Sequence, residues 1–164
     1  DATAAFTGGG AGCGYTQSQF IDVTSVGAAP PAGYAFPQGL FQFVTANCTS
    51  GSTLTMNVTY AQPISAGAVF YKWGKTADNP TPHWYQHPAT ISGATLTYQV
   101  TDGGAGDDDL TRNGSMADPG GLAVPLAEPA AAVAVPTLAQ WAQLLLCVLL
   151  VLCGTPMVQR KRVR

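Results

Sequence analysis

Charged residues are scarce in this sequence. Lysine and arginine number 7 and aspartate and glutamate 9 among 164 residues, so 10 % of the chain is charged, against about 25 % in a typical soluble domain. Because apolar residues still make up 46 %, the chain is not a charged disordered polymer. Its 19 glycines and 12 prolines disfavour a helix-rich bundle. The composition indicates one exported domain rich in turns.

Basic residues are almost missing before position 160. The last five positions hold four of the seven, namely Arg160, Lys161, Arg162 and Arg164. The rest of the chain is left with three basic residues against nine acidic ones. A nucleic-acid-binding domain needs clustered lysine and arginine to neutralise phosphates, so this class of function is excluded.

The residue patterns of common catalytic centres are also missing. No serine or cysteine stands in a nucleophile-elbow pattern, no phosphate-binding glycine loop precedes a helix, and Glu128 is the single glutamate. His83 and His87 have a zinc-like spacing for a helix, but Pro82 and Pro88 flank them. On a strand these histidines would be about 13 Å apart, too far to share a metal. We therefore expect no enzyme.

An uncharged segment stands near the C-terminus, at 138–158. As a helix it would be about 32 Å long, which matches a hydrocarbon core of about 30 Å. The basic tail at 160–164 then places the C-terminus in the cytoplasm and residues before about 135 outside, by the positive-inside rule. The sequence predicts a single transmembrane helix; a buried core helix is the alternative.

The start of this segment reads VPTLAQWA over 135–142. With the apolar helix and the basic tail, it resembles the IPTL-CTERM sorting signal of Gram-negative bacteria, whose usual pattern is IPTLSEWG. The residues that carry the resemblance are Val135, Pro136, Thr137, Leu138 and Trp141, with valine a conservative departure. The resemblance implies recognition by an exosortase-type transpeptidase in the inner membrane and transfer to the cell surface or medium. A plain uncut membrane anchor is the alternative.

Composition divides the chain into four parts. We expect a flexible N-terminal segment at 1–12, a folded domain at 13–121, a Pro/Ala-rich linker at 122–135 and the sorting signal at 136–164. Because the chain begins at Asp1 and not at methionine, we also expect that a signal peptide or a longer upstream region has been removed.

The folded part shows the two-residue period of strands. Thr53 to Tyr60 and Thr95 to Thr101 alternate apolar residues with threonine, asparagine or glutamine. Shorter apolar runs at 40–44, 68–73 and 83–86 are separated by Gly/Pro-rich turns. Five to eight short strands in about 110 residues predict an all-β fold, an antiparallel β-sandwich.

Only two cysteines, Cys13 and Cys48, lie outside the apolar C-terminal segment. In an exported chain such a pair is most simply a disulfide, which the loop-entropy model values at about 3 to 4 kcal/mol. Two free thiols are the alternative.

Five of the nine acidic residues fall within 102–121, a glycine-rich stretch. Calcium needs about six to eight oxygen ligands on a pliable backbone, which closely spaced Asp and Asn with intervening Gly can supply. The candidate calcium ligands are Asp102, Asp107, Asp109, Asn113 and Asp118. The spacing does not match an EF-hand loop, and an acidic surface loop built from turn-forming residues is the alternative.

A second resemblance covers about 110 residues. It is carried by CGY at 13–15, FQFV at 41–44, YKWGK at 71–75, WY at 84–85 and above all TDGGAGDDD at 101–109 with DPGG at 118–121. These motifs resemble the choice-of-anchor U domain, found in bacterial surface proteins just before interchangeable sorting signals. That family implies a place in the cell but no reaction.

The aromatic residues Trp73, Trp84 and Tyr85 are candidates for a sugar-stacking platform, although core packing is the commoner role of such side chains.

Taken with the two resemblances, the sequence predicts a non-enzymatic bacterial cell-surface domain that is exported, sorted through its C-terminal helix and processed by an exosortase-type enzyme. The alternative is a carbohydrate-binding or adhesive module with a calcium-stabilised loop, with surface glycans as partners.

Overall fold

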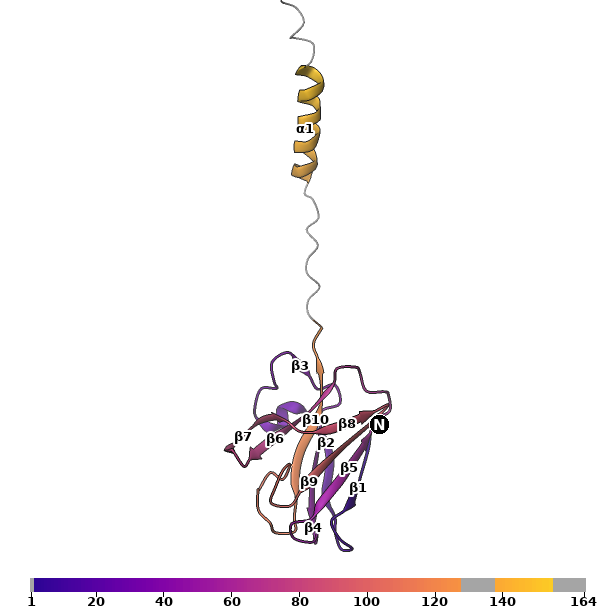
Figure 1. Ribbon diagram of the computed structural model, residues 1–164, viewed down its shortest axis with the longest axis vertical. Coiled ribbons are helices and arrows are strands. Elements are labelled where there is room, and N and C mark those ends of the chain that lie inside the picture. Colours follow the sequence, from indigo (N-terminus) through magenta and orange to yellow (C-terminus); the bar gives the residue numbers. More distant parts are fainter. Residues whose placement is uncertain (1, 128–137, 155–164) are drawn as a thin grey trace, which may run out of the picture. The chain divides into compact units, whose positions relative to one another are not determined.

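The computed structural model describes residues 2–127 and 138–154. The chain divides into two compact units, Asp1–Ala127 and Glu128–Arg164. The first unit is a β-sandwich of two antiparallel sheets, as the sequence predicts (Figure 1).

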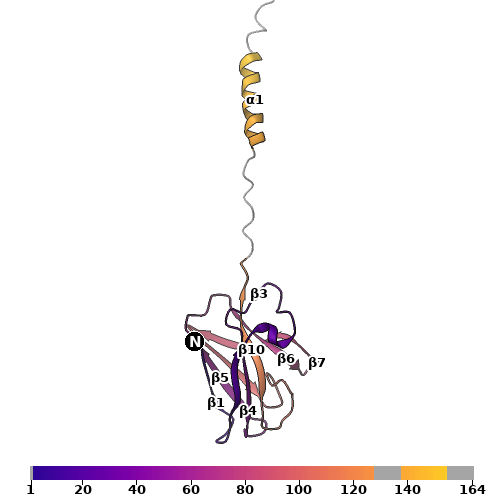
Figure 2. The same ribbon diagram turned by 180° about the vertical axis from the view of Figure 1, so that it is seen from behind.

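The smaller sheet has four strands, in the order β1 (Thr3–Gly8), β5 (Thr53–Thr59), β9 (Thr95–Thr101) and β8 (Ala89–Ser92). The larger sheet has the order β2 (Gly14–Ile21), β4 (Leu40–Ala46), β10 (Ala117–Pro125), β6 (Val69–Thr76) and β7 (Asn79–Gln86), and the short β3 (Tyr34–Ala35) pairs with the end of β10. Figure 2 shows the 3-10 helix η1 (Val23–Val26), which follows β2 in the chain. The chain therefore crosses between sheets after β1, β4, β5, β7 and β9.

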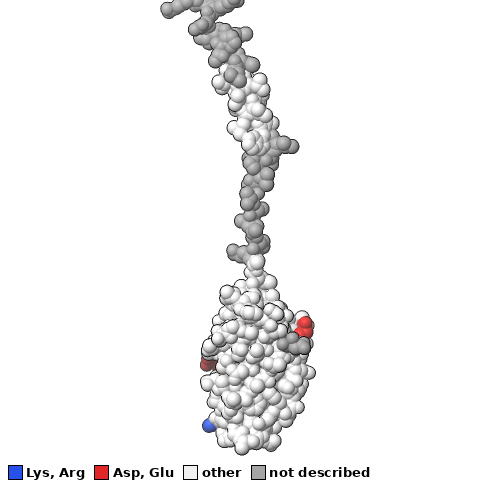
Figure 3. Space-filling view, turned by 90° about the vertical axis from the view of Figure 1, so that its right-hand side faces the viewer, with Lys and Arg blue, Asp and Glu red and all other residues white. Residues whose placement is uncertain are grey.

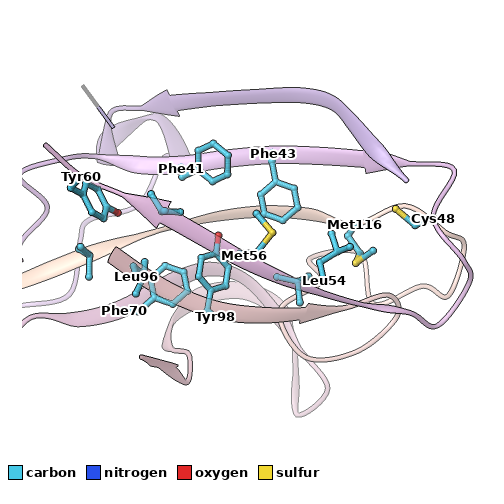
Figure 4. Packing of buried hydrophobic residues seen from close by; sticks show 13 residues of the cluster. Phe41, Phe43, Cys48, Leu54, Met56, Tyr60, Phe70, Leu96, Tyr98 and Met116 are labelled. Carbon is cyan, nitrogen blue, oxygen red and sulfur yellow. The ribbon is translucent and has the colours of Figure 1, made fainter. Parts of the chain in front are cut away.

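Strand alternation builds the core. On β5 the side chains of Leu54, Met56 and Val58 are buried, while Thr55 and Asn57 between them face outward. The core between the sheets also takes buried residues from β4, β6, β9 and β10, as Figure 4 shows, among them Phe41, Phe43, Phe70, Leu96, Tyr98, Val100 and Leu122. The sequence located β5 and β9 by this same period.

Both ends of the sandwich differ from the expected domain bounds. The segment 1–12, expected to be flexible, contributes β1, which pairs with β5 from Thr3↔Thr59 to Gly8↔Leu54. The stretch 122–125, expected to belong to the linker, is the end of β10, where Leu122 and Ala123 are buried. Backbone pairing with neighbouring strands orders both segments despite their weak apolar alternation. The rest of the expected linker, 128–135, lies outside the described residues.

The C-terminal unit contains the helix α1 (Leu138–Gly154). Its described side chains from Trp141 to Val151 are all exposed. Among the described residues, no helix is both long and apolar enough to cross a membrane. The end of the expected span, 155–158, and the basic tail at 160–164 lie outside the described residues.

The surface of the sandwich carries few charges. The face drawn in Figure 3 is almost entirely uncharged. Several of the rare charged residues are not at the surface at all, because Lys72, Asp102, Asp107 and Asp118 are buried. These four charges are costly inside the domain unless they are paired or hydrogen-bonded.

Candidate functional site

Four of the five predicted calcium ligands lie in the acidic loop, which we define as residues 102–116 between β9 and β10. It crosses from the smaller sheet to the larger one. Two of its carboxylates, on Asp102 and Asp107, are buried, while Asp109 is exposed. The loop is therefore held in the folded core through its buried carboxylates and reaches the surface around Asp109.

Asp102 joins the acidic loop to the turn before β5. Its Oδ2 accepts the backbone N–H of Gly51 at 2.6 Å, and Gly114 donates to its Oδ1 at 3.1 Å. Asn113 also donates its backbone N–H to Oδ1. Burial by itself raises the pKa of Asp102, but these three bonds more than offset it and hold the pKa below its usual value. The carboxylate acts as a structural clamp.

Asp107 fastens the middle of the loop in the same way. Its Oδ2 accepts the N–H of Gly103 at 2.8 Å, and its Oδ1 accepts that of Ala117 at 3.2 Å. Here burial outweighs the hydrogen bonds and, together with repulsion from Asp109 and Asp102, raises the pKa to about 6. Two carboxylates of one loop thus have pKa values shifted in opposite directions.

The remaining predicted calcium ligands, Asp109, Asn113 and Asp118, contact other partners. Asp109 accepts the N–H of Thr111 at 2.7 Å and the side-chain amide of Asn113 at 3.0 Å. Asp118 lies on β10, and its Oδ1 contacts Nζ of Lys72 inside the core. Within residues 2–127 and 138–154, no three His, Cys, Asp or Glu side chains converge as a metal site. The five predicted calcium ligands are therefore not gathered around one point, and each of the four aspartates already has a donor from the protein.

The three predicted stacking residues divide between two faces of the larger sheet. Trp73 and Trp84 are cross-strand partners on β6 and β7, with ring centroids 5.4 Å apart. Phe36 packs on Trp84 with a centroid distance of 5.2 Å. All three rings are half-buried. They form an outer aromatic patch, which we define as Phe36, Trp73 and Trp84.

Tyr85 faces the other way, opposite Lys72, and lines a cavity of about 350 Å³. Burial raises its pKa, and repulsion from Asp118, Asp108 and Asp107 adds to this, so the phenol is neutral at physiological pH. The cavity lies between the β6–β7 hairpin and the acidic loop. Its walls are Lys75, Thr76, Ala77, Tyr85, His87, Gly103, Gly104, Ala105, Gly106 and Leu110.

His87 closes the inner side of this cavity. Its Nε2 is 2.7 Å from the carbonyl oxygen of Gln99, so Nε2 carries the proton and donates it. Burial lowers its pKa, and the nearby Lys72 lowers it further, against the effect of the Gln99 bond. A neutral imidazole and a neutral phenol, together with Lys75, thus line a hollow of the size that small ligands occupy.

The structure also shows two features that sequence reasoning missed, the cavity and the buried Lys72. The signal for Lys72 was present in the alternation of β6, where Phe70, Lys72 and Gly74 occupy the inward positions. The cavity had no such signal, because it is formed by residues from β6, β7 and the acidic loop that are distant in the sequence.

The predicted sorting motif is covered in part. Val135, Pro136 and Thr137 lie outside the described residues. Leu138 begins α1, and Trp141 on its first turn is 57 % exposed.

The chain matches no family model, and neither the curated proteins nor the solved structures searched include a similar one.

Proposed function

We propose that residues 1–127 form a non-enzymatic domain of a bacterial cell-surface protein, exported and then sorted or anchored through the segment that begins at Val135. The observation that carries the proposal is the division of the chain into a disulfide-linked sandwich and a separate unit with an uncharged helix. A disulfide between Cys13 and Cys48 fits an oxidising compartment outside the cytoplasm.

The C-terminal part of the proposal rests on the sequence. The motif residues Pro136 and Thr137 precede the uncharged segment, Trp141 lies near its start, and the basic tail follows it. In this proposal the helix inserts in the inner membrane of a Gram-negative bacterium with the tail in the cytoplasm. An exosortase-type transpeptidase then recognises the motif and releases the domain to the surface. The arrangement is that of a choice-of-anchor U domain with an IPTL-CTERM signal.

The sorting step predicts a shortened mature protein. In a Gram-negative host that has the transpeptidase, we expect mass spectrometry of the surface or released protein to find a C-terminus before residue 142. Replacing Pro136 and Trp141 with alanine should leave the uncut chain in the membrane fraction, because the recognition motif is lost. Wild-type protein at the surface that still carries residues 142–164 would show that no cleavage occurs.

A second candidate function, glycan binding, is favoured by the cavity under Tyr85. A phenol ring beside a hollow of about 350 Å³ that Lys75 also lines offers a sugar both a stacking surface and polar partners. The outer aromatic patch offers a different platform on the opposite face of the same sheet. The two surfaces are separable by mutation.

Glycan-array screening followed by NMR titration tests this function. If the cavity binds sugar, we expect Tyr85→Ala to weaken binding at least about tenfold, or roughly 1.4 kcal/mol, while Trp84→Ala leaves it unchanged. The reverse pattern assigns the outer aromatic patch. Absence of binding to any glycan by the folded wild type removes the candidate.

The contacts of the acidic loop do not favour the calcium-stabilised part of this second candidate, and the melting temperature tests that part separately. Because backbone N–H groups or Lys72 already contact the four aspartates, we expect the melting temperature to be the same in calcium and in chelator. Differential scanning calorimetry of the wild type measures this. A rise of several degrees in calcium that is lost in Asp109→Asn would instead assign a calcium site to the exposed end of the loop.

A further inference from the structure

The most unusual polar contact in the domain lies inside the core. Lys72 on β6 and Asp118 on β10 are in direct contact through Nζ and Oδ1, and their side chains are 2 % and 0 % exposed. Lys72 is opposite Gly120 in the ladder, so Asp118 is its diagonal neighbour on the same face of the sheet. A Cβ at Gly120 would stand 3.2 Å from Cγ of Lys72, so glycine there leaves room for the lysine stem.

The surroundings of this pair are poor in hydrogen-bond partners. Nζ donates to the carbonyl oxygen of Gly106 at 2.7 Å, and the Tyr98 ring centroid lies 5.7 Å from Nζ. Apart from the contact with Lys72, neither oxygen of Asp118 accepts a well-aligned hydrogen bond among the described residues, although the buried hydroxyl of Tyr98 lies close enough to lower the pKa of Asp118. A carboxylate ion with its remaining lone pairs unmet is expensive in such a place.

Burial changes the protonation state that each of the two side chains favours. Burial lowers the pKa of Lys72, and the attraction of Asp118, Asp108 and Asp107 only partly opposes it. Burial likewise raises the pKa of Asp118 against the effect of Lys72. Both shifts favour a neutral amine beside a neutral carboxylic acid, which are the two forms that can react with each other.

We propose that Lys72 and Asp118 condense to form an intramolecular isopeptide bond that covalently joins β6 to β10. The lone pair of Nζ adds to Cγ of Asp118, a proton passes from nitrogen to the departing hydroxyl, and the C–O bond breaks to release one water molecule. The new bond is the amide between Nζ and Cγ. No oxidant, reductant or further reactant is required.

The fold supplies what this condensation needs. Because the two groups are already in contact, they react without a prior encounter in solution. Such a fixed geometry corresponds to an effective concentration of about 10⁵ M or more. The carbonyl of Gly106 accepts one N–H of Lys72 and thereby orients the amine. The Tyr98 hydroxyl, close enough to Asp118 to affect its pKa, can donate to the oxygen that becomes negative as nitrogen adds. The amide then replaces two costly ionisable groups with one neutral one.

The amide would join two strands that carry mechanical force if the C-terminal segment anchors the domain, as in the proposed function. β10 is the last strand of the sandwich, and β6 is its ladder neighbour. The Cys13–Cys48 disulfide joins the chain at the start of β2 to the chain just after β4, on the other side of β10. Two covalent ties would then flank the strand through which force from the C-terminal segment enters the domain.

Mass spectrometry of the purified full chain, reduced, alkylated and denatured, tests the proposal. We expect the wild type to be lighter than its sequence by one water molecule. Trypsin cleaves residues 1–127 only after Lys72, Lys75 and Arg112. An amide on Lys72 blocks the first site, so the expected product is fragment 1–75 joined to the fragment that begins at Asn113.

Variants separate this bond from other dehydrations. Lys72→Arg keeps a long basic side chain but cannot form the amide, so its mass should be complete. Asp118→Asn should lose one ammonia and give the same branched peptide as the wild type. A folded wild type of full mass overturns the proposal. A water loss that persists in Lys72→Arg also overturns the proposal, because the water would then come from another site, such as the Asp102–Gly103 dipeptide.

Discussion

Replacing both Cys13 and Cys48 with serine is expected to lower the free energy of unfolding by about 4 kcal/mol. The disulfide closes a loop with a sequence separation of 35 residues, so its loss gives the unfolded chain much more freedom. A domain of this size is stabilised by only about 5 to 15 kcal/mol in total. The expected loss is therefore a large share of the stability, and urea unfolding followed by tryptophan fluorescence measures it.

The surroundings of the bond support a structural role. Thr49 donates its N–H to the carbonyl of Gly9 at 2.7 Å, and Cys48 donates to that of Gly114 at 3.0 Å, so the disulfide lies where the β1–β2 turn, the end of β4 and the acidic loop meet. A Cβ at Gly9 would stand 2.5 Å from Sγ of Cys13. Loosening this corner should therefore affect three segments together.

A matched control is Cys147→Ser, which changes the free thiol on α1 and leaves the disulfide in place. We expect its unfolding curve to match that of the wild type. A double-serine variant that loses less than about 1 kcal/mol would mean that the loop-entropy account does not hold for this chain.

The sequence predicted the parts of the fold whose pattern is local. β5 and β9 alternate apolar and polar residues without interruption, because one face of each packs on the core and the other faces solvent. The strand β10 lacks this alternation because it is central and buried on both faces, so its glycines and its aspartate were interpreted as loop. The strand β1 was missed because its register is set by pairing with β5, a partner distant in the sequence.

The same distinction holds for the candidate site. The acidic loop was located from its composition, and Asp109 with Asn113 behave as turn-forming residues do. The roles of Asp102 and Asp118 were not predictable, because their partners come from the turn before β5 and from β6. Trp84 and Tyr85 are adjacent in the sequence and were grouped together, yet the two-residue period of β7 sends them to opposite faces.

Replacing Asp102 with asparagine is expected to lower the free energy of unfolding at pH 7 by about 2 to 4 kcal/mol. The amide keeps one acceptor oxygen but turns a donor toward the N–H groups of Gly51 or Gly114, which then lose a charged partner while buried. Asp109→Asn is the matched control. Its side chain is exposed, so we expect a change of at most about 0.5 kcal/mol. Equal effects of the two substitutions would contradict this structural role of the Asp102 carboxylate.

The dependence of stability on pH provides a second test of the structural role of Asp102. The pKa of Asp102 is lowered in the folded state, so its contribution is present above the unfolded pKa of about 4 and is lost as the pH falls through the folded value. The deficit of Asp102→Asn should therefore shrink in acid. Asp107 works in the opposite direction, because its folded pKa is raised to about 6. Its contribution is complete below pH about 4 and is lost as the pH rises through about 6, so Asp107→Asn should flatten the stability profile between these values.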